Sequence, residues 1–198
     1  MVLKDAREKV EKAWTTTKKI LALMSVWGLI FSLVTIARLG VAFAYDDALV
    51  NSSAAYEKAQ GAASAQAHGP DYWKTINTSY DLESPKLLPY AAAGVARLFG
   101  FHILILAERQ ATGGEALKKE WRHLAPRGFT FVSDPEELHL HLQDGRYVLF
   151  VGSTDRELLQ ARKAGVYAVR VKRPRKSVLG GEYNPGQLGE VVVPFSDF

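Results

Sequence analysis

Two adjacent carboxylates, Asp46 and Asp47, directly follow a short apolar run, Gly40–Ala44, and a third, Asp155, follows a later apolar run. Large and small apolar residues alternate along the first run, which is typical of a buried strand. Ligands of open α/β sheets bind beyond the carboxyl ends of the strands, where such side chains would lie. Carboxylate oxygens are also the ligands that hard cations prefer. The three aspartates are therefore a candidate weak cation or ligand site.

Two arginines, Arg109 and Arg156, also follow expected strands. Because charged groups removed from water are normally paired, we expect Asp46 and Asp155 to form ion pairs with these arginines, and the cation site is the less favoured alternative. His139 and His141 lie two residues apart on an expected helix, so they point in different directions and cannot chelate one metal ion. The sequence also lacks the phosphate-binding glycine loops and the nucleophile elbow of hydrolases.

The elements that would position these residues alternate between strands and helices. Further strands are expected at His102–Ala107, Phe129–Val132, Tyr147–Val151, Val166–Val171 and Glu190–Pro194. Helices are expected at Asn51–His68, Asp71–Thr78, Thr112–Leu124, Asp134–Gln143 and Thr154–Ala164, and one that begins with Ser84 as its N-cap and runs to Phe99. This alternation predicts an α/β fold with a mainly parallel sheet covered on both faces.

Composition is consistent with a globular domain that carries an extension. The chain has 198 residues, of which 47% are hydrophobic and 23% charged, so it can bury a sizeable core. The net charge of +4 is mild and does not indicate a nucleic-acid partner. The absence of cysteine excludes disulfides, thiolate metal sites and cysteine nucleophiles. We expect two parts, an N-terminal helical segment over residues 1–38 and a domain over 39–198 with a small cap at about 51–83.

The N-terminal segment contains 18 uncharged residues, Ile20–Ala37. As a helix this run is about 27 Å long, which is close to the thickness of a bilayer core. Small residues at spacings of three and four would let a second helix approach closely. The side chains expected to contact a membrane or a partner are Ser25, Trp27, Gly28, Phe31, Ser32 and Thr35.

Three interpretations of this run compete. A membrane-embedded helix is the favoured one, and a helix buried against protein is the second. The third is a signal peptide, because Ala42–Ala44 has the small-x-small form of a cleavage site. Six basic residues precede the run, whereas Arg38 and then Lys58 follow it. This asymmetry predicts a cytoplasmic N-terminus, with the domain on the periplasmic or lumenal side.

A basic run, Arg170–Lys176, carries five positive residues in seven. The favoured interpretation is a solvated strand end and loop. The alternative is a contact with anionic lipid or with an acidic partner.

Three motifs carry a resemblance to a known family. Phe43–Ser53 (FAYDDALVNSS) matches a family strand that ends F-D-x-D-D-T, followed by an apolar pair and two serines. Gly69–Asn77 (GPDYWKTIN) is similar to N-P-x-F-W-x-x-x-N, and Gly189–Ser196 is similar to a closing G-E-x-V-x-x-S strand. From about Ser25 to Phe198 the chain resembles the class B acid phosphatases of the haloacid dehalogenase (HAD) superfamily. The resemblance implies a HAD-like Rossmannoid three-layer fold, here preceded by a long hydrophobic helix.

The resemblance also implies which positions would do chemistry, and most of them have changed. The family's nucleophilic aspartate, which attacks phosphorus, corresponds to Ala44, and a methyl group cannot be a nucleophile. The hydroxyl that holds a phosphoryl oxygen corresponds to Ala107, and Glu108 follows it where an anion would bind. The neutralising lysine falls near Leu138, and a magnesium carboxylate corresponds to Ser153.

Two aspartates of the family pattern, Asp46 and Asp47, are retained, and Asp46 corresponds to the general acid/base. Ala107-Glu108-Arg109-Gln110 stands where the family has T-G-R-S. Phosphoryl transfer depends on positioning and charge neutralisation, and four changes at four strand ends remove both. We therefore expect a pseudophosphatase with no cofactor, Mg²⁺ being implied only for an active enzyme.

The expected function is that of a structural or accessory subunit of a membrane protein complex, associated with other subunits or with itself through the 20–37 helix. Two alternatives remain. One is a membrane-attached phosphatase of altered mechanism, in which Asp46 activates water on a phosphate held by Arg109. The other is a sensor of phosphate ligands.

Overall fold

The computed structural model describes residues 2–62 and 68–198, with side chains from residue 11 onward. Its centre is a six-stranded sheet in the order β5-β4-β1-β6-β7-β8, with every neighbouring pair parallel. The strands are β1 (Leu39–Ala44), β4 (His102–Ala107), β5 (Phe129–Phe131), β6 (Arg146–Gly152), β7 (Tyr167–Val171) and β8 (Val191–Val193). The strand positions predicted from the apolar runs are confirmed to within two residues at each end.

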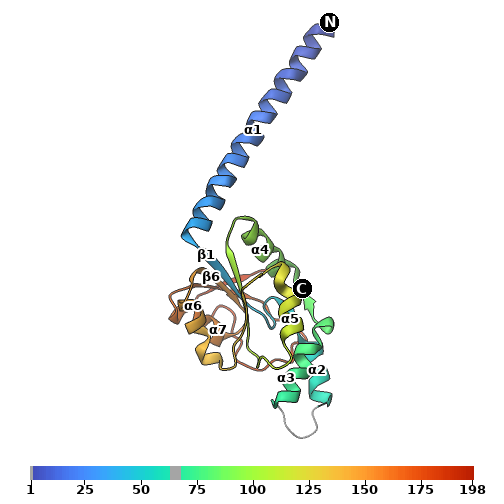
Figure 1. Ribbon diagram of the computed structural model, residues 1–198, viewed down its shortest axis with the longest axis vertical. Coiled ribbons are helices and arrows are strands. Elements are labelled where there is room, and N and C mark those ends of the chain that lie inside the picture. The colour runs from blue at the N-terminus through green and yellow to red at the C-terminus, as the bar shows by residue number, and fades with distance from the viewer. Residues whose placement is uncertain (1, 63–67) are drawn as a thin grey trace.

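Alternation along β1 builds the two halves of the core. Val41 and Phe43 face one cluster, which includes residues of α4 (Leu87–Leu98) and α5 (Glu115–Glu120). Ala42 and Ala44 face the opposite cluster, formed with α6 (Leu138–Gln143) and α7 (Asp155–Lys163). The two helix layers lie on opposite sides of the sheet (Figure 1). The predicted three-layer α/β fold is confirmed.

A small cap lies beyond the carboxyl ends of the strands. It consists of β2 (Val50–Asn51), α2 (Ser53–Ala62), α3 (Pro70–Thr78), the 3-10 helix η1 (Tyr80–Leu82) and β3 (Ser84–Pro85). The strands β2 and β3 pair antiparallel, which closes the cap at its base. Tyr56, Tyr72 and Ile76 form its small core. Of the helix expected at Asn51–His68, the part at 63–67 lies outside the described residues.

The helix α1 (Val2–Ala37) is continuous, without a break between its charged and its apolar parts. It projects away from the sheet as a single rod, with the cap at the far end of the molecule (Figure 1). From Glu11 to Ala37 it is long and apolar enough to cross a membrane, and almost none of it is buried against the domain. Arg38 ends the helix in a left-handed conformation, with φ of 52°, and β1 follows at once.

Two predicted helix starts are wrong. Ser84 is not an N-cap, because its pairing with Asn51 holds it in β3, and α4 begins only after Lys86. The helix expected at Thr112–Leu124 is shorter, since Gly113 adopts a φ of +71° and α5 begins after Gly114.

Two of the expected helical stretches are 3-10 helices, which are wound more tightly than α-helices. Trp121–His123 form the 3-10 helix η2, and Pro135–Glu137 form η3 ahead of α6. Asp134 caps η3 by accepting a hydrogen bond from the Glu136 amide, so the expected start of that segment is retained.

Candidate functional site

The four altered family positions lie at or near the carboxyl ends of the strands. Ala44 ends β1 and Ala107 ends β4, and both methyl groups are buried in the core. Leu138 begins α6 and is fully buried among apolar side chains. Ser153 follows β6 and is also buried, with its hydroxyl 3.5 Å from a carboxylate oxygen of Glu157. Three of the four positions therefore contribute packing in place of polar groups.

Arg109 occupies the centre of this end of the sheet. Its Nε lies 3.0 Å from Asp46 Oδ2, and its Nη2 lies 2.5 Å from Asp46 Oδ1. The same Nη2 lies 2.5 Å from Glu83 Oε1, and Nη1 lies 3.5 Å from Asn77 Oδ1. The side chain is 1% exposed, so these contacts take the place of water. Of the two arginines expected to pair with Asp46, the structure places Arg109 there.

Aromatic rings close the remaining faces of this guanidinium. The rings of Tyr45 and Tyr56 lie 5.0 and 5.2 Å from its central carbon, close enough for cation–π attraction. The Tyr45 hydroxyl donates to Glu83, and the Trp121 indole donates to Tyr45 Oη at 3.2 Å. Burial raises the pKa of the Glu83 carboxyl, and Arg109 partly offsets that shift.

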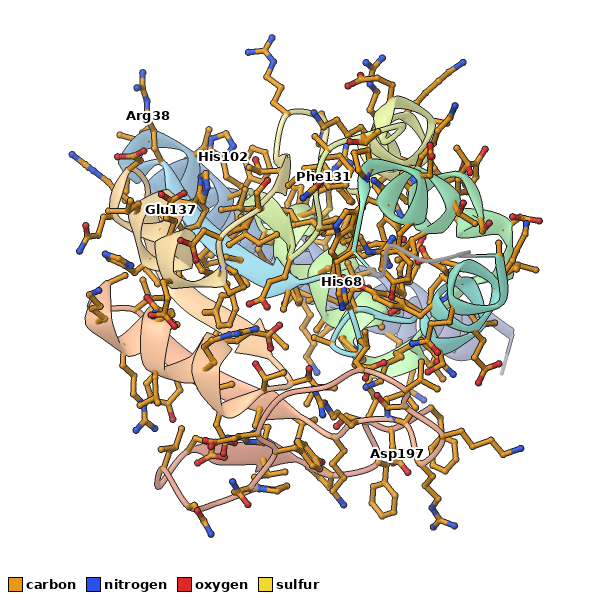
Figure 2. All side chains as sticks on the ribbon, turned by 90° about the horizontal axis from the view of Figure 1, so that it is seen from below. Arg38, His68, His102, Phe131, Glu137 and Asp197 are labelled. Atoms are coloured by element: carbon orange, nitrogen blue, oxygen red, sulfur yellow. The ribbon has the colours of Figure 1, made fainter. Side chains whose placement is uncertain are left out.

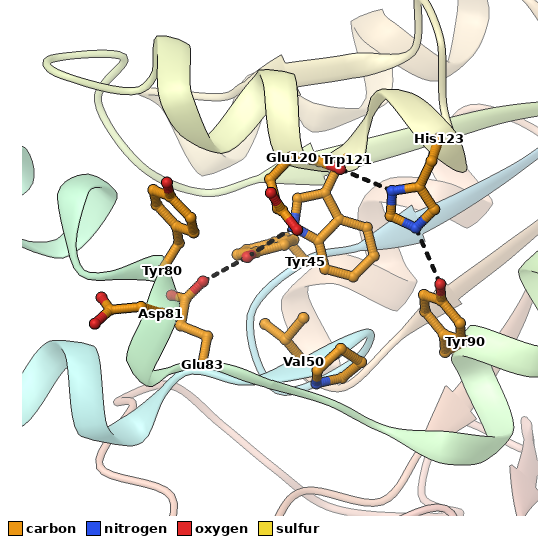
Figure 3. A pocket seen from close by; sticks show the side chains of 10 residues that line it. Tyr45, Val50, Tyr80, Asp81, Glu83, Tyr90, Glu120, Trp121 and His123 are labelled. Atoms are coloured by element: carbon orange, nitrogen blue, oxygen red, sulfur yellow. Dashed lines mark hydrogen bonds between the residues drawn. The ribbon is translucent and has the colours of Figure 1, made fainter.

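The back of this cluster opens into a pocket of about 350 Å³. Its lining includes Tyr45, Glu83, Trp121, Tyr90 and His123 (Figure 3). His123 Nδ1 lies 2.7 Å from the Glu120 carbonyl, so it carries the proton and Nε2 accepts from the Tyr90 hydroxyl at 3.0 Å. The polar groups of these five lining residues therefore already have partners within the protein.

Asp47 points into a separate buried cluster. Ser177 Oγ donates to its carboxylate, and Arg173 Nε lies 3.8 Å from the same oxygen. Lys86 Nζ donates to the Asp47 carbonyl at 2.8 Å and to the Lys172 carbonyl at 2.5 Å. Burial raises the pKa of Asp47 to about 6 and lowers the pKa of Lys86 to about 8.

Asp155 belongs to a third cluster and is not paired with Arg156. Its Oδ1 lies 2.7 Å from Arg170 Nη2, and Asn184 donates to both of its oxygens. Arg170 also donates to Glu190 and is fully buried. The expected pairing of Asp155 with Arg109 or Arg156 is wrong, because Arg170 extends from strand β7 and forms the ion pair with Asp155 instead.

Glu157 ties down the loop that follows β6. It accepts hydrogen bonds from the Ser153 and Thr154 amides at 2.7 and 2.9 Å, and Thr154 caps α7 in return. Burial, followed by the nearby charge of Glu108, raises the pKa of Glu157 to about 8. Glu108 itself pairs with Arg156 at 2.8 Å, and burial raises its pKa as well. This edge of the site is lined by carboxylates, which disfavour an anionic ligand.

The residues present do not fit a magnesium ion. Both carboxylate oxygens of Asp46 accept hydrogen bonds from Arg109, and Ala44 and Ser153 supply no carboxylate. Mg²⁺ requires several oxygen ligands in near-octahedral array. Among the side chains that the structure describes, those of residues 11–62 and 68–198, no group of three histidines or carboxylates is arranged to hold a metal ion. Asp46, Asp47 and Asp155 thus belong to three clusters, each engaged by its own cation.

The basic run at Arg170–Lys176 divides between structural and exposed residues. Arg170 and Arg173 are held by internal partners, the latter by the Leu179, Gly180 and Gly181 carbonyls. The other three cations of the run, Lys172, Arg175 and Lys176, are exposed. The run begins in the last two residues of β7 and continues past its carboxyl end, so it lies at the end of the parallel sheet opposite the attachment of α1.

Most of the α1 residues expected to contact a membrane or partner are exposed. Ser25 and Ser32 donate to carbonyls one turn earlier, and the space around Gly28 is open. Phe31 and Thr35 are also exposed in part, but they lie against Gly100 of the domain and line a hollow at the base of α1.

Sequence reasoning missed several residues that build the site. Glu83, Asn77 and Tyr45 surround Arg109, and Lys86 and Ser177 surround Asp47, yet none stands at an altered family position. Glu83 and Lys86 follow η1 in the cap, and only the pairing of β2 with β3 brings that segment back to β1. The sequence carried no local signal for these contacts, because the residues that make them are far apart in the chain.

The sequence matches no protein-family model and no curated protein. Among solved structures, the fold is similar to CbbY from Rhodobacter sphaeroides in complex with phosphate, with a TM-score of 0.53, 12% identity, and coverage of 82% of this chain and 100% of that chain. It is also similar to a predicted phosphoglycolate phosphatase from Haemophilus somnus, with a TM-score of 0.54, 13% identity, and coverage of 80% and 95%.

A HAD-like hydrolase from Streptococcus pneumoniae is similar to the same degree, with a TM-score of 0.52, 12% identity, and coverage of 79% and 94%. At these identities the likeness concerns the fold. The chain therefore has a HAD-like α/β fold, carried on a long apolar N-terminal helix.

Proposed function

We propose that this protein is a catalytically inactive HAD-like domain that serves as a structural or accessory subunit of a membrane protein complex, anchored by α1. The observation that carries the proposal is the closed cluster around Arg109. Asp46, the one retained acid/base position, accepts two hydrogen bonds from this guanidinium, and Glu83 neutralises it further. In the family frame, Ala44 stands where the nucleophile would attack phosphorus, and Leu138 stands where a lysine would neutralise the transferred phosphoryl group.

The enzyme alternative has less support, because it needs Arg109 to hold a phosphate while Asp46 activates water. Arg109 already donates to Asp46, Glu83 and Asn77 and is enclosed by aromatic rings. A phosphate would have to displace two carboxylates from a nearly water-free site. The same geometry disfavours a phosphate sensor that uses the old pocket.

The membrane part of the proposal rests on α1. An isolated helix that exposes large apolar side chains along its length requires a covering environment. The continuous rod of α1, with its apolar half next to the domain, suits a bilayer-spanning anchor. The basic residues before this half favour a cytoplasmic N-terminus and a domain on the opposite side.

The test is extraction of the native protein in mild detergent, followed by size-exclusion chromatography and mass spectrometry. A complex with other chains, of fixed stoichiometry across the peak, is expected. A protein that leaves the membrane without detergent, or that elutes as a single chain, would contradict the subunit role. A Leu29→Lys variant provides a control, because a charge in the middle of the anchor should release the protein from the membrane fraction.

A further inference from the structure

The outward face of α4 is apolar where a helix of a water-soluble domain would be polar. Its exposed residues are Leu87, Leu88, Ala91, Ala92, Val95 and Leu98, with Arg97 as the one charge among them. Leu98 is 65% exposed and Val95 is 52% exposed. A surface helix normally buries one apolar stripe and presents polar residues outward. The described part of this chain does not cover the stripe.

The position of α4 relative to α1 bears on what would cover this stripe. The turn after α4 packs on the last turns of α1, where a Cβ on Gly100 would lie 2.8 Å from Thr35 Oγ1 and 3.1 Å from the Phe31 carbonyl. Phe99 borders a wholly apolar hollow together with Leu23, Met24, Val26, Trp27 and Ile30 of α1. The turn after α4 rises beside the base of α1 (Figure 1).

The position of Phe99 beside Ile30 sets how deep the end of α4 would lie in a bilayer. Ile30 precedes the end of α1 at Ala37 by seven residues, or about 10 Å of helix. If the apolar run of α1 lies in a bilayer, a side chain beside Ile30 lies below the level at which α1 leaves it. The C-terminal end of α4 is therefore at the depth that interfacial helices reach, about 5–10 Å below the headgroups.

A ring of cations surrounds this point at headgroup level. Arg38, Arg97, Arg127 and Arg146 are exposed around the base of α1, with His102 beside them and Asp144 as an acidic neighbour of Arg146. Figure 2 shows the Arg38 side chain projecting outward from the ribbon. Arg146 Nη1 lies 3.3 Å from the Ala37 carbonyl, which places it at the junction of α1 and the domain. Apolar side chains rimmed by arginines suit the boundary between acyl chains and lipid phosphates.

We propose that the end of α4 inserts into the same leaflet surface from which α1 emerges, so that the domain is held against the membrane at two points. The occupant of the α4 face is lipid: acyl chains at Val95, Leu98 and Phe99, and headgroup phosphates at the arginine ring. This inference rests on the proposed membrane anchoring by α1. It adds that the domain has a fixed orientation on the bilayer, with its cap directed away from the lipid.

The absence of cysteine makes a direct test available, because a single introduced cysteine is the only labelling site. Spin labels are placed by Leu98→Cys and Val95→Cys on α4, Leu29→Cys in the middle of α1, and Leu159→Cys as an exposed control on α7. The full chain is reconstituted in vesicles of phosphatidylcholine with a minority of phosphatidylglycerol. Relaxation by oxygen, which concentrates in lipid, is compared with relaxation by a water-soluble nickel chelate.

The expected result is lipid-like accessibility at Leu29 and Leu98, an intermediate value at Val95 and water-like accessibility at Leu159. Leu98 exposed to the nickel chelate, with Leu29 in lipid, would overturn the α4 insertion and leave the anchor intact. Leu98 shielded from both reagents would also overturn it, because protein and not lipid would then cover α4. Leu29 exposed to the chelate would overturn the proposed anchoring itself.

Discussion

The two ends of the parallel sheet differ in which side chains have partners within the described chain. At the carboxyl end, charged residues are buried and paired with one another, as Arg109 is with Asp46 and Glu83. At the amino end, apolar residues of α1 and α4 are exposed and lack a cover within the described chain. Ligand sites of open α/β sheets lie at the carboxyl end, so this domain has a closed surface where its fold usually has an open one. This difference is the reason that we propose an interacting surface at the end next to α1.

The largest expected effect concerns the closed end. Arg109→Met would leave Asp46 and Glu83 buried without a counter-charge, and breaking such a cluster costs about 3–5 kcal/mol of unfolding free energy. Urea unfolding of the full chain in detergent measures this loss. Arg175→Met, at an exposed arginine, is the matched control and should change stability by less than about 0.5 kcal/mol. A loss at Arg109 no larger than the control would mean that the carboxyl end is open to water.

Restoring the missing nucleophile should not reopen the site. Ala44→Asp would bury a carboxylate among apolar side chains, at a cost of about 2 kcal/mol or more. Hydrolysis of a phosphate monoester should remain at the background measured without protein, because Arg109 still holds Asp46. The neutral variant Ala44→Asn separates the effect of size from the effect of charge. Turnover by Ala44→Asp that Ala44→Asn lacks would show that only the nucleophile had been lost.

The buried carboxylate Glu157 gives the closed end a characteristic pH dependence. Its pKa is raised from 4.5 to about 8, so the folded state binds its proton more tightly than the unfolded state does. The free energy of unfolding should therefore fall as pH rises from 4.5 to about 8, and the loss between pH 6 and 8 should be about 2 kcal/mol. Glu157→Gln keeps an acceptor for the Ser153 and Thr154 amides and should flatten the slope. Asp47, with a pKa of about 6, affects the pH dependence of stability mainly below pH 6.

The contact between α1 and the domain should be sensitive to a single methyl group. Gly100 has a φ of +86° and no room for a Cβ beside Phe31 and Thr35. Gly100→Ala should cost about 1–2 kcal/mol through backbone strain, with a further clash against α1. Gly94→Ala on α4 is the control, because its Cβ would meet open space and should stabilise the helix by about 0.5–1 kcal/mol. Equal effects of the two changes would contradict both the left-handed conformation of Gly100 and its packing against α1.

The smallest expected effect concerns the exposed face of α4. Leu98→Gln should change the free energy of unfolding in detergent by less than about 0.5 kcal/mol, because the side chain is mostly exposed and glutamine is a good helix former. The Leu98→Gln change should alter only how strongly the domain associates with the membrane. A large loss of folding stability would mean that α4 is covered within the domain.

The parts of the molecule that were predictable from sequence are those governed by local patterns. The strand at Gly40–Ala44 and those that follow were evident because apolar alternation and short apolar runs are local signals. The altered positions, such as Ala44 and Ser153, could be placed because they stand at fixed distances from strand ends. The cluster around Arg109 could not be assembled, since Glu83 and Asn77 reach it from the cap through tertiary packing.

The exposed face of α4 was also beyond sequence reasoning. Its apolar residues resemble those of a buried helix, and only the structure shows that Ala93 faces the core while Leu98 faces outward. Burial that depends on tertiary contacts also explains why Arg170 was expected to lie in a solvated run. Its side chain is fully buried against Asp155 and Glu190, which lie in different elements.

The most direct test of the closed carboxyl end is phosphate release from a monoester by the full chain in detergent, with Mg²⁺ present. The account predicts a rate equal to that without protein, unchanged by Asp46→Asn. A Mg²⁺-dependent rate above background that Asp46→Asn abolishes would contradict it, because Asp46 would then be free of Arg109 and available for catalysis.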